Sequence, residues 1–386
     1  MKTTILSLTA AALLLTACGG QKPSPAPADP LADSGRTQRT EHLLSSLRQM
    51  AADGHYMFGH QDDPVYGVGW VGDSARSDVQ SVCGDWPALM SFDLGHLELG
   101  DAQNLDGVPF DRMRQEIVNH FERGGVVSLS WHLNNPLSGG TAWVDKEKAD
   151  VESRTVEAVL EGGEQHATFL TWLDRVAHFL CSLQTADGIR VPVIFRPWHE
   201  HSGSWFWWGQ DHCTTEQYVA LWQLTEQRLK QQGVVNALYA YSPNSVAAGS
   251  TKEAYMERYP GDSLVDIIGF DQYCTAQEGD TAALARYAAE LDQNLAIVCE
   301  AAQEHGKVAA LTETGYESLK SPDWWTRTLA PVLARHPVSY VLVWRNAHNL
   351  PGHFYAPYPG QQSANDFVQF YNDPKTLFCR DLQNVY

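Results

Sequence analysis

The chain contains little positive charge. Lys and Arg account for 27 of its 386 residues, against 46 Asp and Glu, so the formal net charge is −19. A protein that binds nucleic acid needs a basic surface to displace counterions, and a protein held by anionic lipids needs one as well. The composition therefore argues against nucleic acid as a partner and against electrostatic binding to a membrane surface.

Several motifs are also missing. No two cysteines have CxxC spacing, so the sequence offers no cysteine-based zinc site, and it does not decide how the cysteines after Cys18 pair. No GxGxxG or Walker motif follows an early strand, which removes the usual signature of a nucleotide-binding doubly wound sheet. The sequence therefore indicates neither a cysteine-bound metal nor a nucleotide cofactor.

The N-terminus resembles an export signal. Lys2 precedes the apolar run 5–15, which is too short to cross a bilayer as a mature helix. The sequence Leu15-Thr16-Ala17-Cys18 resembles a bacterial lipobox, which predicts lipidation of Cys18; the alternative is an ordinary signal peptide with an incidental cysteine. We expect a signal peptide over 1–17, a lipidated Cys18 with a Pro-rich tether over 18–38, and a catalytic domain over 39–386. The membrane would be contacted only through the anchor, with the periplasmic face of the outer membrane favoured over the cell surface.

The rest of the chain alternates short apolar runs with helical patterns. We predict eight strands, over 56–59, 88–92, 126–131, 191–196, 237–241, 265–270, 308–312 and 339–344. Helices are expected over 110–123, 169–184 and 215–232, with another opening at 321–322 and kinked at Pro331. This alternation predicts an α/β fold, a single-domain (β/α)8 TIM barrel with enlarged loops; a doubly wound sheet is the alternative.

Tryptophan is abundant, with 13 residues, and a cluster of Trp outside a core suggests a flat apolar ligand such as a sugar face. Seven Trp fall at or after the predicted ends of strands three, four and eight. Two carboxylates stand at such ends, Glu200 after the fourth strand and Glu313 ending the seventh. Across a barrel mouth they could lie about 5 Å apart, the separation typical of a retaining glycosidase.

Five segments carry a family resemblance. The stretch 195–209, Phe-Arg-Pro-Trp-His-Glu-His-Ser-Gly-Ser-Trp-Phe-Trp-Trp-Gly, closely resembles the acid/base region of glycoside hydrolase family 26, the endo-β-1,4-mannanases. Similar agreement is found at 311–317 (Leu-Thr-Glu-Thr-Gly-Tyr-Glu), 341–347 (Val-Leu-Val-Trp-Arg-Asn-Ala), 269–273 (Gly-Phe-Asp-Gln-Tyr) and 130–134 (Ser-Trp-His-Leu-Asn). The similarity runs in register from about residue 54 to the C-terminus. It implies Glu200 as acid/base, Glu313 as nucleophile, retention of configuration, and no need for a metal or other cofactor.

The chemistry of the pair predicts its surroundings. The nucleophile must stay ionised, so it needs hydrogen-bond donors or a cation, for which Tyr273 and Arg345 are candidates. The acid must stay protonated, and Trp198 and Trp205 could supply an apolar setting that raises its pKa.

Other residues are expected to contact the sugar. His199 would hydrogen-bond the sugar or an active-site carboxylate, and the resemblance places His132 against the sugar two subsites from the cleavage point. Aromatic platforms are predicted beneath the reacting sugar and on the leaving-group side, from Trp344, Trp205 and Phe206. Weaker candidates are Trp143, together with Asp93 and His96 for distant subsites. Trp207 and Trp208 suit packing equally well, and Asp271 could orient Arg196, orient Arg345 or bind substrate.

The sequence thus predicts a monomeric, lipid-anchored enzyme that hydrolyses internal bonds of β-mannan polysaccharides and oligosaccharides. Two alternatives stay open. The same scaffold could act on a β-glucan or a β-1,3-xylan, or the chain could be a non-catalytic surface lipoprotein that binds glycans. The second alternative leaves the two strand-end carboxylates unexplained.

Overall fold

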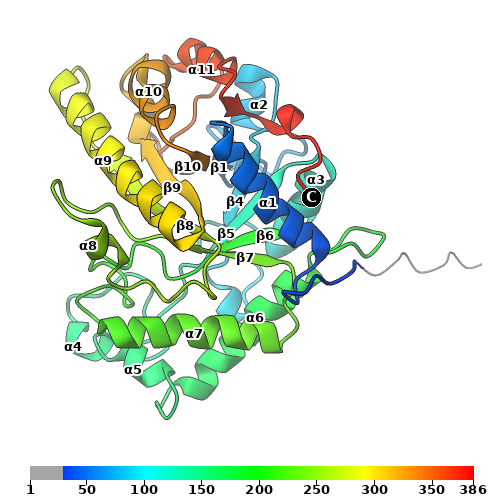
Figure 1. Ribbon diagram of the computed structural model, residues 1–386, viewed down its shortest axis with the longest axis vertical. Helices are drawn as coiled ribbons and strands as arrows, with labels where there is room; N and C mark the ends of the chain where they lie inside the picture. Colours follow the sequence, from blue (N-terminus) through cyan, green and yellow to red (C-terminus); the bar gives the residue numbers. More distant parts are fainter. Residues whose placement is uncertain (1–28) are drawn as a thin grey trace, which may run out of the picture.

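Eight parallel strands close into a barrel in the computed structural model, which describes residues 29–386 (Figure 1). The predicted signal peptide and Cys18 lie outside the described residues. The strands are β1 (Tyr56–Gln61), β4 (Leu89–Asp93), β5 (Val126–Ser130), β6 (Val193–Arg196), β7 (Ala237–Tyr241), β8 (Ile267–Cys274), β9 (Val308–Tyr316) and β10 (Val338–Val343). They pair in sequence order, and β10 pairs with β1 to close the sheet. This confirms the predicted (β/α)8 barrel and excludes the doubly wound sheet.

Short additional strands lie at the margins. The strand β11 (Thr376–Leu377) pairs with the start of β1, while β2 (Tyr66–Gly67) and β3 (Trp70–Val71) form a small hairpin after β1. The predicted strands are all present, but β8 and β9 run four residues further than expected. That extension carries both strands past the barrel rim and into the site described below.

Helices surround the barrel (Figure 1). They are α1 (Gln38–Ala52), α2 (Asp78–Cys83), α3 (Phe110–Glu122), α4 (Ala149–Glu152), α5 (Thr155–Val159), α6 (His166–Ser182), α7 (Thr215–Gln231), α8 (Lys252–Met256), α9 (Thr281–His305), α10 (Ala330–Leu333) and α11 (Ala364–Tyr371). Thr214 caps the start of α7, with a reciprocal bond from Gln217. The helix expected from residue 321 begins instead as a π-helical turn, Trp325–Leu329, and becomes α-helical where Pro331 lies in the first turn of α10.

Helix α1 covers the amino-terminal end of the barrel. Leu43, Leu44 and Leu47 are buried in one cluster with a side chain from each barrel strand. Those strand residues are Met57, Leu89, Val126, Ile194, Leu238, Ile267, Val308 and Leu342. Just before α1, Arg36 pairs with Asp266 at 2.8 Å, so the segment leading into the helix already packs on the barrel. With this end plugged, the opposite end of the barrel is the one available for a site.

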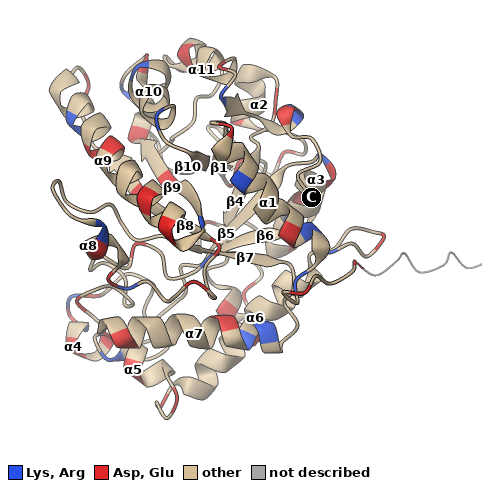
Figure 2. Cartoon of the chain, in the orientation of Figure 1, with Lys and Arg blue, Asp and Glu red and all other residues tan. Residues whose placement is uncertain are grey.

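The charge is carried mainly on the outside. Figure 2 shows Asp and Glu spread over outer helices such as α9. In the part of the chain that the structure describes, no helix combines the length and apolar character that a bilayer crossing needs. All six cysteines within residues 29–386 are free thiols.

Candidate active site

Glu200 stands on a strained loop directly after β6. Its backbone and that of Trp198 both adopt left-handed conformations, with φ of 53° and 55°, which non-glycine residues rarely adopt. The Glu200 backbone N–H donates to the carbonyl of Ser242 at 2.7 Å, which fixes the loop against β7. The Trp205 indole N–H donates to the Glu200 carboxylate at 2.7 Å. Burial, followed by repulsion from Asp271 and Glu313, raises the pKa of Glu200 to about 8.

Glu313 is presented by an irregularity in β9. Phe270 of β8 pairs with Leu311, but the next residue, Asp271, pairs with Glu313, so Thr312 is an extra residue on β9. The Thr312 hydroxyl bonds the Phe270 carbonyl and the Asp271 carboxylate at 2.9 and 2.8 Å. The bulge therefore places Asp271 and Glu313 side by side at the mouth of the barrel.

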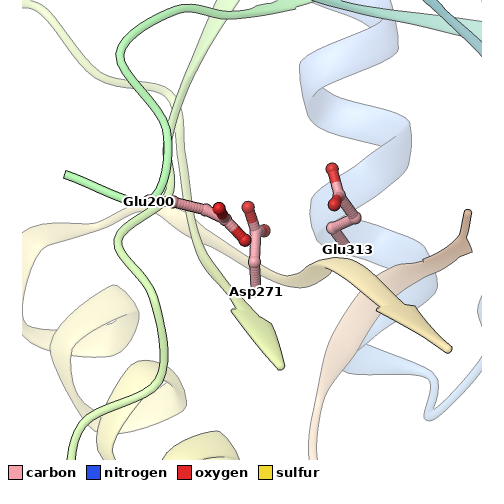
Figure 3. Close-up of side chains that lie close together, drawn as sticks. All are labelled: Glu200, Asp271 and Glu313. Atoms are coloured by element: carbon pink, nitrogen blue, oxygen red, sulfur yellow. The ribbon is translucent and has the colours of Figure 1, made fainter. Parts of the chain in front are cut away.

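Three carboxyl groups converge there, as Figure 3 shows. Glu200, Asp271 and Glu313 each present an oxygen within 4.8 Å of the other two. The Glu200–Glu313 separation matches that of a retaining glycosidase, about 5 to 5.5 Å, and is shorter than the roughly 6.5 to 9.5 Å of an inverting one. Two carboxyl groups this close leave little room for a water between them and can act on one bound substrate.

Arg196 supplies the cation of this cluster. Its buried guanidinium bonds the Asp271 carboxylate at 2.6 Å and also bonds the Glu313 carboxylate. Asp271 accepts a further bond from the Ser242 hydroxyl at 2.7 Å. Of the three roles left open for Asp271, the geometry supports the orientation of Arg196. Arg196 in turn holds the Glu313 carboxylate in place by a charge-assisted hydrogen bond.

Of the two donors predicted for Glu313, one is correct. The Tyr273 hydroxyl donates to Glu313 at 2.5 Å. Arg345 does not reach Glu313, because it pairs with Asp106 at 3.0 Å and lies over the Tyr66 ring. The prediction for Arg345 was wrong because Arg196 supplies the cation beside Glu313. The sequence had indicated Arg196 only as a possible partner of Asp271.

His132 and His199 form a chain that ends on Asp93. The Asp93 carboxylate accepts from His132 Nδ1 at 2.7 Å, and His132 Nε2 lies 2.9 Å from His199 Nε2. Burial opposes protonation of His132, but the Asp93 carboxylate outweighs it and raises the pKa of His132. Burial, with Arg196 and His132 nearby, holds the pKa of His199 well below its usual range. Of the two rings, His132 therefore holds a second proton the more readily, and one Nε2–H is shared between them.

This arrangement corrects the expectation for Asp93. It is completely buried and does not line a distant subsite. Besides His132, it accepts bonds from the Ser130 hydroxyl at 2.6 Å and from the Gly95 backbone at 2.7 Å. Its role is to hold His132, which faces Trp143 with ring planes 8° apart.

Three of the predicted aromatic platforms are open to solvent. Trp143 and Trp205 are 46% and 39% exposed, and Trp344 is half-buried near His132. The Trp205 ring lies against Gly203, where any Cβ would come within 2.2 Å of it, so only glycine fits beneath the ring. Phe206 is buried and packs against His132, Trp143 and Trp208, so it supports the site and offers no free platform.

The remaining tryptophans of this loop are structural. Trp198, Trp207 and Trp208 are fully buried and pack edge to face. The Trp198 indole donates to Thr225 on α7, so Trp198 faces the outer helices and does not supply the predicted apolar setting for Glu200. The Trp208 indole donates to the carbonyl of His199 at 2.8 Å, which fixes the backbone next to Glu200.

The carboxylate cluster is the one place in residues 29–386 where three metal-ligating side chains converge. Two of its three members are already bound by Arg196, which supplies the positive charge that a divalent ion would otherwise bring. The arrangement is thus complete for acid–base and nucleophilic chemistry by its own side chains.

Comparisons with known proteins agree on one family. The sequence model of glycosyl hydrolase family 26 matches residues 32–316. A solved structure described as a GH26 β-mannanase from Bacteroides ovatus is 50% identical, covers 91% of this chain and 98% of its own, and superposes with a TM-score of 0.86. A modular endo-β-1,4-mannanase from Cellulomonas fimi is 31% identical, with coverage of 92% and 79% and a TM-score of 0.80.

A curated relative is longer. The mannan endo-1,4-β-mannosidase of Bifidobacterium adolescentis is 29% identical over 367 residues, which is 90% of this chain but 35% of that protein. The chain thus spans about a third of the length of that relative. The family model spans both Glu200 and Glu313, and the chain belongs to glycosyl hydrolase family 26.

Proposed function

We propose that this chain is an endo-β-1,4-mannanase that hydrolyses mannan, glucomannan or galactomannan with retention of configuration. The observation that carries the proposal is the pairing of Glu200 and Glu313, which present oxygens within 4.8 Å of each other. Glu313 is bound by Arg196 and Tyr273, whereas Glu200 is buried beside two other carboxylates. The mannanase relatives named above support mannan as the substrate class.

In the first step, the ionised Glu313 carboxylate attacks the anomeric carbon. Arg196 and Tyr273 both donate to this carboxylate and hold it in place. Glu200, protonated at neutral pH because its pKa is raised to about 8, gives its proton to the leaving oxygen. The glycosyl–enzyme ester that results leaves Glu200 as a carboxylate.

In the second step, Glu200 acts as a base. It removes a proton from water, which attacks the anomeric carbon on the face that the leaving group vacated, and Glu313 departs as a carboxylate. Two inversions give net retention. His132, Trp143, Trp205 and Trp344 surround this reaction as candidates for holding the sugars.

The assignment is tested with two variants and two substrates. Glu313→Ala should lose turnover on both mannan and an aryl β-mannobioside. Glu200→Ala should lower kcat/KM roughly 10²–10⁴-fold on mannan but much less on the aryl substrate, whose leaving group needs no proton. Its kcat should fall on both substrates, because the second step still needs the base. Glu317→Ala, at an exposed carboxylate paired with His353, is the control. Full activity of either catalytic variant on mannan would refute the assignment.

A substrate panel separates the alternatives. Mannan, β-glucan and β-1,3-xylan are digested in parallel, and product lengths are followed over time. Early release of long manno-oligosaccharides is the result expected of endo action on mannan. Faster hydrolysis of another polysaccharide, or binding without release of reducing sugar, would overturn the proposed substrate or the proposed activity.

We also propose that the enzyme is exported and lipid-anchored through Cys18, on the periplasmic face of the outer membrane. The lipobox-like sequence 15–18 and the Pro-rich stretch that follows support this proposal. Labelled palmitate should enter the wild-type protein but not Cys18→Ser. Equal labelling of the two, or label in neither, would contradict it.

A further inference from the structure

The loops after β5 and β6 are joined beside the catalytic acid. Segment 142–144 of the first loop runs antiparallel to segment 205–207 of the second, in an isolated β-bridge. The Val144 backbone N–H donates to the Trp205 carbonyl at 2.8 Å, and a second backbone bond, at 3.1 Å, joins the opposite ends of the two segments. The exposed rings of Trp143 and Trp205 are therefore carried by one unit that two loops build together.

A single buried carboxylate holds both sides of the first segment. Glu152, at the end of α4, is completely buried. One of its oxygens accepts from the Ser138 hydroxyl at 2.6 Å, and the other accepts from the Asp145 backbone N–H at 2.8 Å. Ser138 precedes segment 142–144 and Asp145 follows it directly. Glu152 therefore clamps the segment from both sides.

The clamp requires an acid at position 152. A carboxylate has two acceptor oxygens and no donor, which matches the two donors that face Glu152. An amide in its place would turn an N–H toward one of these donors. Burial of a carboxylate is costly unless hydrogen bonds compensate for the lost water. The position of this costly group, beneath a loop of the site, points to a role in the site.

The β-bridge connects the clamp to the catalytic acid. Trp205, held at its carbonyl by Val144, donates its indole N–H to the Glu200 carboxylate at 2.7 Å. Trp143, in the middle of the clamped segment, stacks on His132 with ring centroids 5.3 Å apart. A displacement of the clamped segment would therefore reach Glu200 through Trp205.

We propose that Glu152 is a positioning residue for the catalytic acid, because it holds the loop after β5 where Trp205 can keep its bond to Glu200. The inference rests on the proposed function, since it assumes that Glu200 is the acid. Without the clamp, the bond from Trp205 should be formed for less of the time. Because this bond favours the ionised acid, its loss should raise the pKa of Glu200 and move the alkaline limb of kcat/KM to higher pH.

Two substitutions weaken the clamp in different ways. Glu152→Gln replaces one acceptor by a donor, and Ser138→Ala removes one of the two bonds. Each should move the alkaline limb upward by roughly 0.3 to 0.5 unit on soluble mannan, less than the shift of about one unit expected when the indole donor itself is removed. Glu157→Gln, the same change at an exposed carboxylate of α5, is the matched control and should keep the wild-type limb. Thermal melting verifies that each variant folds.

A double variant tests whether Glu152 acts through Trp205. In Trp205→Phe the bond to Glu200 is already absent, so Glu152→Gln should add no further shift to that background. A role confined to the stability of the loop would lower the melting temperature and leave the limb in place. None of these variants alters the other titratable groups that face Glu200, which are Asp271, Glu313, His132 and Tyr273.

Two failures are distinguishable. A limb that does not move upward in Glu152→Gln and Ser138→Ala, an equal shift in Glu157→Gln, or shifts that add in the double variant would overturn the positioning role while mannan hydrolysis by the wild type stands. A wild-type enzyme that releases no reducing sugar from mannan would instead overturn the proposed function.

Discussion

Trp205 influences the pKa of Glu200 through a single hydrogen bond. Its indole N–H donates to the Glu200 carboxylate at 2.7 Å. A donor favours the ionised form, so this bond lowers the pKa of Glu200 and opposes the increase caused by burial and by Asp271 and Glu313. Trp205→Phe removes the donor and keeps an aromatic face for the sugar. The pKa of Glu200 should therefore rise above about 8.

The size of the shift follows from the strength of the bond. A hydrogen bond to a charged group contributes about 1.5 to 3 kcal/mol, and one pKa unit corresponds to about 1.36 kcal/mol. Trp205 is partly exposed, so water replaces part of the lost bond, and we expect the lower end, about one unit. Because Glu200 must be protonated to act as an acid, the alkaline limb of kcat/KM should move to higher pH by that amount.

The assay is the pH dependence of kcat/KM on a soluble mannan between pH 4 and 10. Trp344→Phe, which removes a Trp that makes no bond to Glu200, is the control and should leave the alkaline limb in place. A limb that stays fixed in Trp205→Phe, or one that moves to lower pH, would refute the reasoning.

Three further changes probe the neighbours of the carboxylates. Arg196→Lys replaces a planar fork by a point charge that cannot hold two carboxylates at once, so kcat should fall roughly 10²-fold or more and the melting temperature should drop; wild-type kcat would contradict the role of Arg196. Tyr273→Phe removes one donor from Glu313 and should lower kcat about 10²–10³-fold with an unchanged circular dichroism spectrum; a change in KM alone would argue against it. Asp93→Asn should cost about 3 to 5 kcal/mol in the free energy of unfolding near pH 6, because it breaks a buried pair with His132. The raised pKa of His132 means that its stabilising contribution is present at low pH and is lost as pH rises through that pKa, so the deficit measured by urea unfolding should shrink toward alkaline pH; a deficit that grows with pH would contradict the pairing.

The sequence predicted the barrel because its strands are apolar on both faces and its helices are amphipathic. It also predicted Glu200 and Glu313, since charged residues at the ends of buried strands are expensive without a function. Side-chain partners were harder to predict. Arg196 ends β6 and Arg345 follows β10, and the sequence does not show that the first side chain reaches Glu313 while the second turns to Asp106.

Two other differences have the same origin. Thr312 is an extra residue in the β8–β9 ladder, and a bulge of this kind leaves no sequence pattern that distinguishes it from a regular strand. The buried Asp93 could have been anticipated only by asking which group satisfies His132. In the loop 198–208, Trp198, Trp207 and Trp208 are buried while Trp205 is exposed, and the sequence alone does not distinguish them.

Glu313 as the nucleophile of a retaining reaction is the central claim, and a covalent trap tests it most directly. The enzyme is incubated with a 2-fluoro β-mannoside that carries a good leaving group, and the labelled peptide is identified by mass spectrometry. We predict a single glycosyl label, on Glu313, formed at once and lost slowly. A label on Glu200 or Asp271, or a product of inverted configuration with no covalent species, would contradict the account.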